Sequence, residues 1–154
     1  MATHAIRHGE EALMETATLP AHGEALRYAV PLGRLLYSLI FLMSVPTHFA
    51  SATIQHAAAQ GVPWASVLVP LSGVLALLGG LSVLLGFQAR IGALLLILFL
   101  IPVTLMMHRF WGLHDAQAAM MQRIHFVKNV SMLGGALVLA YFGAGPISID
   151  ARHH

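Results

Sequence analysis

Long apolar runs separated by short polar breaks dominate the pattern of the chain. No Asp, Glu, Lys or Arg occurs in the 55 residues between Arg34 and Arg90. A membrane-spanning helix needs about 20 apolar residues, so this stretch must contain two spans and a turn. The turn falls at about Pro46–Ser66, which is rich in Pro, His, Thr and Gln. We therefore expect spans at about Leu32–Phe49 and Val67–Phe87.

Two more apolar runs follow a very short turn at Gln88–Arg90. They cover about Ile91–Met107 and Phe126–Phe142, with a polar connection at His108–Arg123 between them. Runs of this length favour membrane helices over the shorter strands of a membrane barrel. The pattern predicts an all-α integral membrane four-helix bundle with up-down connectivity.

The two ends of the chain differ from this apolar region. Residues 1–30 carry several Glu residues and lack the long apolar core of a signal peptide. We interpret them as a short amphipathic cytosolic tail with candidate helices at Glu11–Ala17 and His22–Val30. Residues 31–150 form the predicted membrane domain, and residues 151–154 a C-terminal tail.

Composition supports a membrane protein and excludes several kinds of chemistry. Hydrophobic residues make up 58% of the chain and charged residues 9%, whereas soluble domains have about 45–50% and about 25%. The formal net charge of +2 is too small to indicate a nucleic-acid partner. Because there is no Cys, the chain holds no disulfide, zinc-thiolate site or Cys-ligated iron–sulfur cluster. Any redox role must use a bound cofactor, a quinone or a partner chain.

Polar and aromatic side chains collect at one end of the predicted bundle. In an up-down array this end receives His48, His56, Trp64, His108, Arg109, Trp111, His114, Asp115, His125, Lys128 and Asn129. The spacing of His125, Lys128 and Asn129 places them on one side of a helix. Lys128 lies inside an apolar run, where a charge is costly and usually faces a cavity or a partner. Asp115 and Asn129 are its candidate partners.

This set of side chains suits the head of a quinone. A neutral His can hydrogen-bond a quinone carbonyl, and Arg109 and Lys128 can stabilise the reduced anion. We expect His108 and Arg109 to contact the ligand beside Trp111, aided by His48, His125, Lys128 and Asn129. The competing interpretation is that these residues simply anchor helix ends at the membrane interface.

A metal or haem site is less favoured by the same residues. Imidazole suits zinc, copper and iron. However, only His4 and His8, in the N-terminal tail, have the His-x-x-x-His spacing of a preformed site. Two ligands alone bind a metal weakly. We therefore assign no metal ligand.

An ordered set of short motifs resembles the DoxX family of small bacterial four-helix membrane proteins. The motifs are Gly33-Arg34-Leu35-Leu36, Leu78-Gly79-Gly80-Leu81, Arg90-Ile91-Gly92-Ala93, Thr104 with His108 and Phe110, Phe126-Val127-Lys128-Asn129, Leu133-Gly134-Gly135 and Gly143-Ala144-Gly145-Pro146. Within them we assign structural roles to Arg34, Gly79, Gly80, Arg90, Gly134 and Gly135.

The resemblance implies a protein of the bacterial cytoplasmic (inner) membrane. Members of the DoxX family are linked to membrane oxidoreductases, including a thiosulfate:quinone oxidoreductase. There are departures from the family's pattern. His48 stands near the position of a Lys in many members, and Ala76 and Leu77 stand where many carry a carboxylate before the Gly-Gly pair.

Three functional hypotheses remain open. The first is the quinone-linked membrane subunit of an oxidoreductase system, with its polar site at the outer membrane face. The second is a non-catalytic membrane anchor or assembly factor for a larger partner. The third, less favoured, is a haem- or metal-binding electron-transfer subunit. All three imply contact with the lipid bilayer and with a partner subunit or a second copy of the chain.

The distribution of Arg and Lys predicts the orientation. The side with both termini carries Arg7, Arg27, Arg34, Arg90 and Arg152, and the opposite side carries Arg109, Arg123 and Lys128. Because cytoplasmic loops are enriched in positive residues, both termini should be cytosolic. A topology reporter fused after Arg90 should therefore report the cytosol, and one fused after Ala119 the periplasm. The reverse pattern would show that the orientation is inverted.

Overall fold

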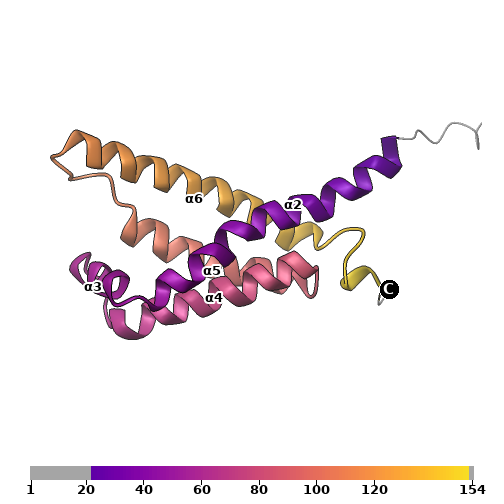
Figure 1. Ribbon diagram of the computed structural model, residues 1–154. Helices are drawn as coiled ribbons and strands as arrows, with labels where there is room; N and C mark the ends of the chain where they lie inside the picture. The colour runs from indigo at the N-terminus through magenta and orange to yellow at the C-terminus, as the bar shows by residue number, and fades with distance from the viewer. Residues whose placement is uncertain (1–21, 153–154) are drawn as a thin grey trace, which may run out of the picture.

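The described part of the chain, residues 22–152 of the computed structural model, consists of helices joined by short connections (Figure 1). In chain order they are α2 (His22–Ser44), η1 (Val45–Phe49), α3 (Ser51–Ala59), α4 (Ala65–Leu85), α5 (Ala89–Met107), α6 (Ala116–Phe142) and η2 (Asp150–Arg152). Four helical segments, at Leu26–Phe49 and over α4, α5 and α6, are long and apolar enough to cross a membrane. These segments run alternately in opposite directions. The predicted all-α, four-helix membrane architecture is confirmed.

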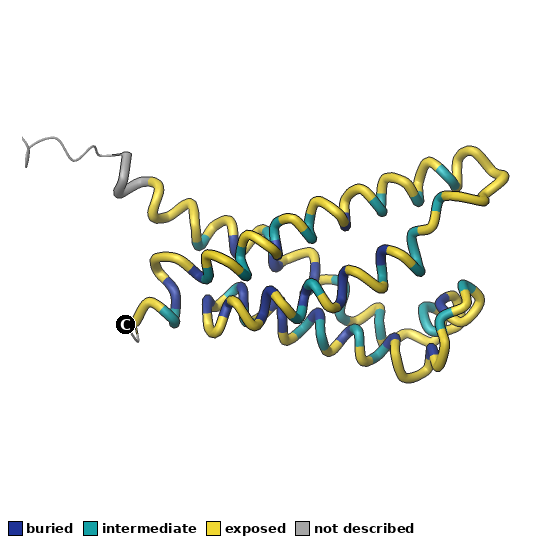
Figure 2. The backbone as a smooth tube through the Cα atoms, turned by 180° about the vertical axis from the view of Figure 1, so that it is seen from behind, coloured by how far each residue is buried: buried dark blue, intermediate teal, exposed yellow. Residues whose placement is uncertain are grey.

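The core of the bundle lies along α4 and α5. α4 packs against both α2 and α5, and α5 packs against α6. Phe41, Ala76, Val83, Leu96 and Leu100 are buried together in the centre. Figure 2 shows buried positions gathered along α4 and α5 and becoming sparse along α6, where only Asn129 and Ala136 are buried. The outer faces carry the exposed apolar side chains that a bilayer would cover.

Adjacent glycines let α4 approach two different helices. A Cβ on Gly79 would lie 2.8 Å from the Leu96 side chain and 2.9 Å from the Gly92 carbonyl oxygen, both on α5. A Cβ on Gly80 would lie 3.0 Å from Leu42 on α2. Small residues permit such close backbone approach in membranes, where van der Waals packing drives helix association. Gly79 thus allows the close approach of α5, and Gly80 allows that of α2.

The second glycine pair divides its contacts unequally. A Cβ on Gly135 would lie 2.9 Å from the Tyr37 ring of α2, whereas a Cβ on Gly134 would meet nothing within 4 Å. The Tyr37 hydroxyl also donates to the Met132 carbonyl of α6 at 2.7 Å. Gly135 and Tyr37 are therefore the point at which α2 and α6 meet.

The helices differ in three places from those predicted from hydropathy. α2 begins at His22 rather than Leu32, so the expected boundary at residue 30 falls inside it. A charged residue and a proline, such as Arg27 and Pro31, often mark the end of a helix, but α2 continues through both. The Arg27 guanidinium lies 5.7 Å from the centre of the Tyr28 ring. The candidate helix His22–Val30 is helical as part of α2, and Glu11–Ala17 lies outside the described residues.

The other two differences lie at the far end of the bundle. The expected turn at Pro46–Ser66 contains η1 and α3, because a mixed sequence of Ala, Thr and Gln can form helix without forming a span. α6 begins at Ala116 rather than Phe126, with the Asp115 carboxylate accepting the Ala118 N–H at 2.6 Å as an N-cap. Hydropathy therefore missed the polar first turns of α6.

The glycine contacts predict opposite effects for two alanine substitutions. Gly79→Ala should lower the free energy of unfolding by roughly 1–3 kcal/mol, because its methyl group overpacks against the α5 backbone. Gly134→Ala, the matched control, should raise it by about 0.5–1 kcal/mol, because alanine is the better helix former in open space. Thermal unfolding of the two variants in detergent measures both effects. Equal melting temperatures would contradict the proposed α4–α5 contact.

Candidate functional site

A cavity of about 560 Å³ opens at the end of the bundle where α3 lies, and we call it the α3-end cavity. Its walls come from α2, η1, α3, α4, α5 and α6, so every spanning helix contributes. Most of the lining is aliphatic, aromatic or methionine side chains. The polar lining residues are Ser44, Thr47, His48, Thr53, Ser72, His108, Lys128 and Asn129. A mostly apolar cavity with a few polar groups is the usual form of a small-molecule site.

His48 is placed in the wall by the short helix η1. Its ring packs against Phe99 with centroids 5.5 Å apart, and its Nδ1 lies 2.9 Å from the Ser44 carbonyl oxygen. A Cβ on Gly73 of α4 would lie 2.7 Å from the His48 Cβ. The absence of a side chain at Gly73 is therefore what lets His48 approach α4.

His108 ends α5 and contacts the first half of α6. Its Nδ1 lies 3.0 Å from the Gln122 side-chain oxygen. Its ring stacks on His125 with centroids 5.2 Å apart and planes inclined by 29°. Burial lowers the pKa of His108, and the nearby His125 and Lys128 lower it further against the opposing effect of Gln122. Burial therefore favours the neutral form of this imidazole.

The stacked pair also aligns α6 with α5. Because His125 lies at the level of His108, residues 116–124 of α6 extend past the end of α5 (Figure 1). The next turns of α6 bring Lys128 and Asn129 to the α3-end cavity. Asn129 is buried and Lys128 remains exposed at the cavity wall. The charged and amide groups therefore lie deeper along α6 than the imidazole pair.

The structure excludes Asp115 as a partner of Lys128. Both residues belong to the same helix and lie more than three turns apart, about 20 Å along the axis. The Asp115 carboxylate instead caps the start of α6. Asn129, the other expected partner, lines the cavity with Lys128.

Arg109, Trp111 and His125 do not line the α3-end cavity, although all three were expected to contact the ligand. The Arg109 guanidinium donates to the Gln60 carbonyl at 2.8 Å and so joins the α5–α6 connection to the end of α3. Trp111 packs edge-to-face against Phe110 and Phe126. The chain leaves helical geometry after α5, so the side chains of Arg109 and Trp111 point away from the cavity, and the sequence alone does not reveal this.

The remaining expected polar residues lie at the surface, and one contributor was missed. His56, Trp64 and His114 are exposed and absent from the cavity wall. Gln122, which bonds His108, was not among the predicted site residues. Its spacing of three residues before His125 on α6 was the available signal. Within residues 22–152, no group of three or more His, Cys, Asp or Glu side chains could hold a metal ion.

The opposite end of the bundle is organised by the buried Arg34. Its guanidinium donates to the Ala144 carbonyl at 2.9 Å and the Ile147 carbonyl at 2.6 Å, both in the segment after α6. Gly86, in the left-handed region at φ 63°, contacts the guanidinium so closely that a Cβ would overlap it. Arg34 thus joins α2, the α4–α5 turn and the C-terminal segment.

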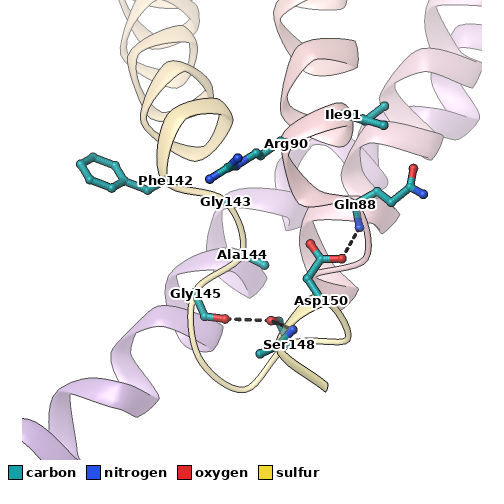
Figure 3. A pocket seen from close by; sticks show the side chains of 10 residues that line it. Gln88, Arg90, Ile91, Phe142, Gly143, Ala144, Gly145, Ser148 and Asp150 are labelled. Atoms are coloured by element: carbon teal, nitrogen blue, oxygen red, sulfur yellow. Dashed lines mark hydrogen bonds between the residues drawn. The ribbon is translucent and has the colours of Figure 1, made fainter. Parts of the chain in front are cut away.

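A second cavity of about 560 Å³ lies beside this segment, lined by residues including Arg90, Ile91, Phe142 and Gly143 (Figure 3). Asp150 also lines it, but both carboxylate oxygens accept backbone N–H groups at the start of α5, from Gln88 at 2.7 Å and Ala89 at 3.1 Å. This carboxylate therefore serves as a helix cap. The second cavity holds fewer polar groups free for a ligand than the α3-end cavity does.

Comparison with known proteins identifies a different family from the one expected. Residues 8–154 match the SURF4 family. The chain is also 30% identical over 132 residues to the inner membrane protein YphA of Escherichia coli (strain K12), covering 84% of this chain and 94% of the relative. No solved structure matches the chain.

These matches correct one prediction and confirm another. The resemblance to the DoxX family is wrong, because the family match covers nearly the whole chain and is to SURF4. Short Gly- and Leu-rich motifs recur wherever membrane helices pack closely, so their order misled the assignment. Localisation in the bacterial inner membrane, with several membrane-spanning helices, is confirmed.

The contacts of Arg34 predict that it holds the C-terminal segment. Arg34→Met should leave the Ala144 and Ile147 carbonyls unpaired, at about 1–3 kcal/mol each. The segment should then detach, and its cleavage by an added protease should accelerate at least about tenfold. Arg152→Met, in the same segment but exposed, is the matched control and should cleave like the unchanged protein. Equal cleavage of the two variants would show that Arg34 does not retain the segment.

Proposed function

We propose that this chain, which belongs to the SURF4 family, is a quinone-binding membrane subunit of an oxidoreductase system. The observation that carries the proposal is the α3-end cavity, in which apolar walls adjoin His48, His108, Lys128 and Asn129. A quinone has the matching shape, with an apolar tail and a ring bearing oxygens at one end. A quinone also dissolves in the bilayer that surrounds the bundle.

The polar residues of the cavity suit binding and proton handling. Neutral His108 can accept a proton from a ring hydroxyl, as quinone chemistry requires. The Lys128 ammonium favours a reduced, negatively charged ring, and Asn129 can hydrogen-bond a ring oxygen. With no Cys in the chain, the electrons must come from a partner or from another bound group.

A second candidate function is the docking of a partner protein. The extension of α6 beyond α5 exposes Met120 (66%), Met121 (50%) and Ile124 (50%). Exposed apolar side chains grouped on one helix favour an interaction surface. This observation supports the anchor or assembly role and is compatible with a quinone site.

Quinone binding predicts a clear effect at His108 and none at His56. His108→Ala should weaken the binding of a short-chain quinone analogue that bears a ring hydroxyl group about five- to a hundredfold, the effect of losing one hydrogen bond whose partner stays buried. His56→Ala removes an exposed imidazole at the same end of the bundle and should leave the affinity unchanged. Titration of the purified proteins in detergent, followed by tryptophan fluorescence, measures both.

Two outcomes would contradict the proposal. If the unchanged protein does not bind the analogue, the quinone function is wrong and the docking role is preferred. If all three proteins bind equally, the analogue lies outside the α3-end cavity. Arg109→Ala provides an additional control, because Arg109 contacts Gln60 rather than the cavity.

A further inference from the structure

The hydrogen bond between His108 and Gln122 determines which ring nitrogen of His108 carries the proton. The Gln122 side-chain oxygen lies 3.0 Å from Nδ1, and an amide oxygen can only accept a hydrogen bond. With the Gln122 amide in this orientation, Nδ1 is the donor. In the neutral imidazole, which burial favours, the other nitrogen, Nε2, then has a lone pair and no proton.

This assignment defines what His108 can offer to a ligand. His108 lines the α3-end cavity, whereas Gln122 does not, so the nitrogen left for a ligand is Nε2. An Nε2 lone pair accepts a hydrogen bond from a hydroxyl group and gives nothing to a carbonyl oxygen, which is itself an acceptor. The stacking of the ring on His125 restricts its rotation and so maintains this arrangement.

We infer that the α3-end cavity selects a hydroxyl-bearing aromatic head, the hydroquinone form, over the corresponding carbonyl-bearing quinone, and that Gln122 is the positioning residue for this choice. The inference rests on the proposed function and specifies the substrate form that the site takes. Lys128 supports it. When a hydroxyl group of the head shares its proton with His108, negative charge grows on the hydroxyl oxygen, and the Lys128 ammonium in the same cavity stabilises that charge.

Burial and the neighbouring basic residues oppose the protonation of His108. His125 and Lys128 approach it from α6, and His48 lines the same cavity from η1. Once acid conditions protonate His108, Nε2 becomes a donor. The affinity for the hydroquinone should then fall and that for the quinone rise, so the preference should reverse as the pH drops below the pKa of His108. A residue with only a structural role would change both affinities in the same direction.

The test compares decyl-benzoquinone with its hydroquinone, kept reduced under anaerobic conditions. At pH 7.5 the purified full chain should bind the hydroquinone about tenfold more tightly, equivalent to about 1.4 kcal/mol. Gln122→Leu frees His108 to place its proton on either nitrogen, so the preference should fall to below about threefold. Gln117→Leu, on the exposed first turn of α6, is the matched control and should retain the tenfold preference.

Each outcome distinguishes this inference from the proposed function. If neither form binds, both are overturned. If both forms bind equally to the unchanged protein, or the quinone binds more tightly, quinone binding stands and the selection for hydroxyl groups is wrong. If Gln122→Leu keeps the full preference, Gln122 does not position His108. A lower preference accompanied by an unchanged melting temperature excludes loss of folding as the cause.

Discussion

The close contact between α4 and α5 positions every other part of the bundle. Gly79 on α4 lies directly against the α5 backbone at Gly92, and the buried side chains of Val83, Leu96 and Leu100 extend from this contact. α2 packs on one side of this pair through Gly80, and α6 packs against α5. In lipid, helices gain little by hiding apolar surface from one another, so association depends on such short-range packing. The bundle is organised around the two helices that can approach most closely.

The two ends of the bundle differ in how the backbone groups outside the helices find hydrogen-bond partners. Backbone groups outside helices need hydrogen-bond partners when they lie near the bilayer. At the C-terminal end, Arg34 and Asp150 supply them, with the guanidinium bonding two carbonyls and the carboxylate bonding two N–H groups. This end is consequently tied together by its own polar groups.

At the α3 end, fewer of the polar side chains form hydrogen bonds with one another. α2 gives way to η1 at Val45, α6 extends past α5, and a cavity is left between them. His108 and Gln122 bond each other, whereas Lys128 and Asn129 lie along the wall. A cationic group and an amide beside two imidazoles can donate hydrogen bonds to a ligand and stabilise negative charge on it. Membership of the SURF4 family neither supplies nor excludes this chemistry, because function resides in the site rather than in the fold.

The sequence by itself determined the number, type and order of the membrane helices. The 55 uncharged residues between Arg34 and Arg90 exceed one span. Such runs form helices in lipid because a helix satisfies its own backbone hydrogen bonds. The same reasoning brought His48, His108, Lys128 and Asn129 to one end of the bundle. The sequence predicted a helix from His22 but separated it from the first span, and hydropathy did not locate the start of α6 or reveal α3. Helix formation continues where apolar character ends.

Only the tertiary structure decided which of the collected residues share the cavity. Arg109 and Trp111 adjoin His108 in the chain yet point to Gln60 and to Phe126, because the chain leaves helical geometry at the end of α5. The N-cap role of Asp115 removed the expected partner of Lys128. The bond from Gln122 to His108 depends on the register between α5 and α6, which the packing of side chains sets. Helical periodicity states which residues share a face, but the direction of that face comes from the neighbouring helix.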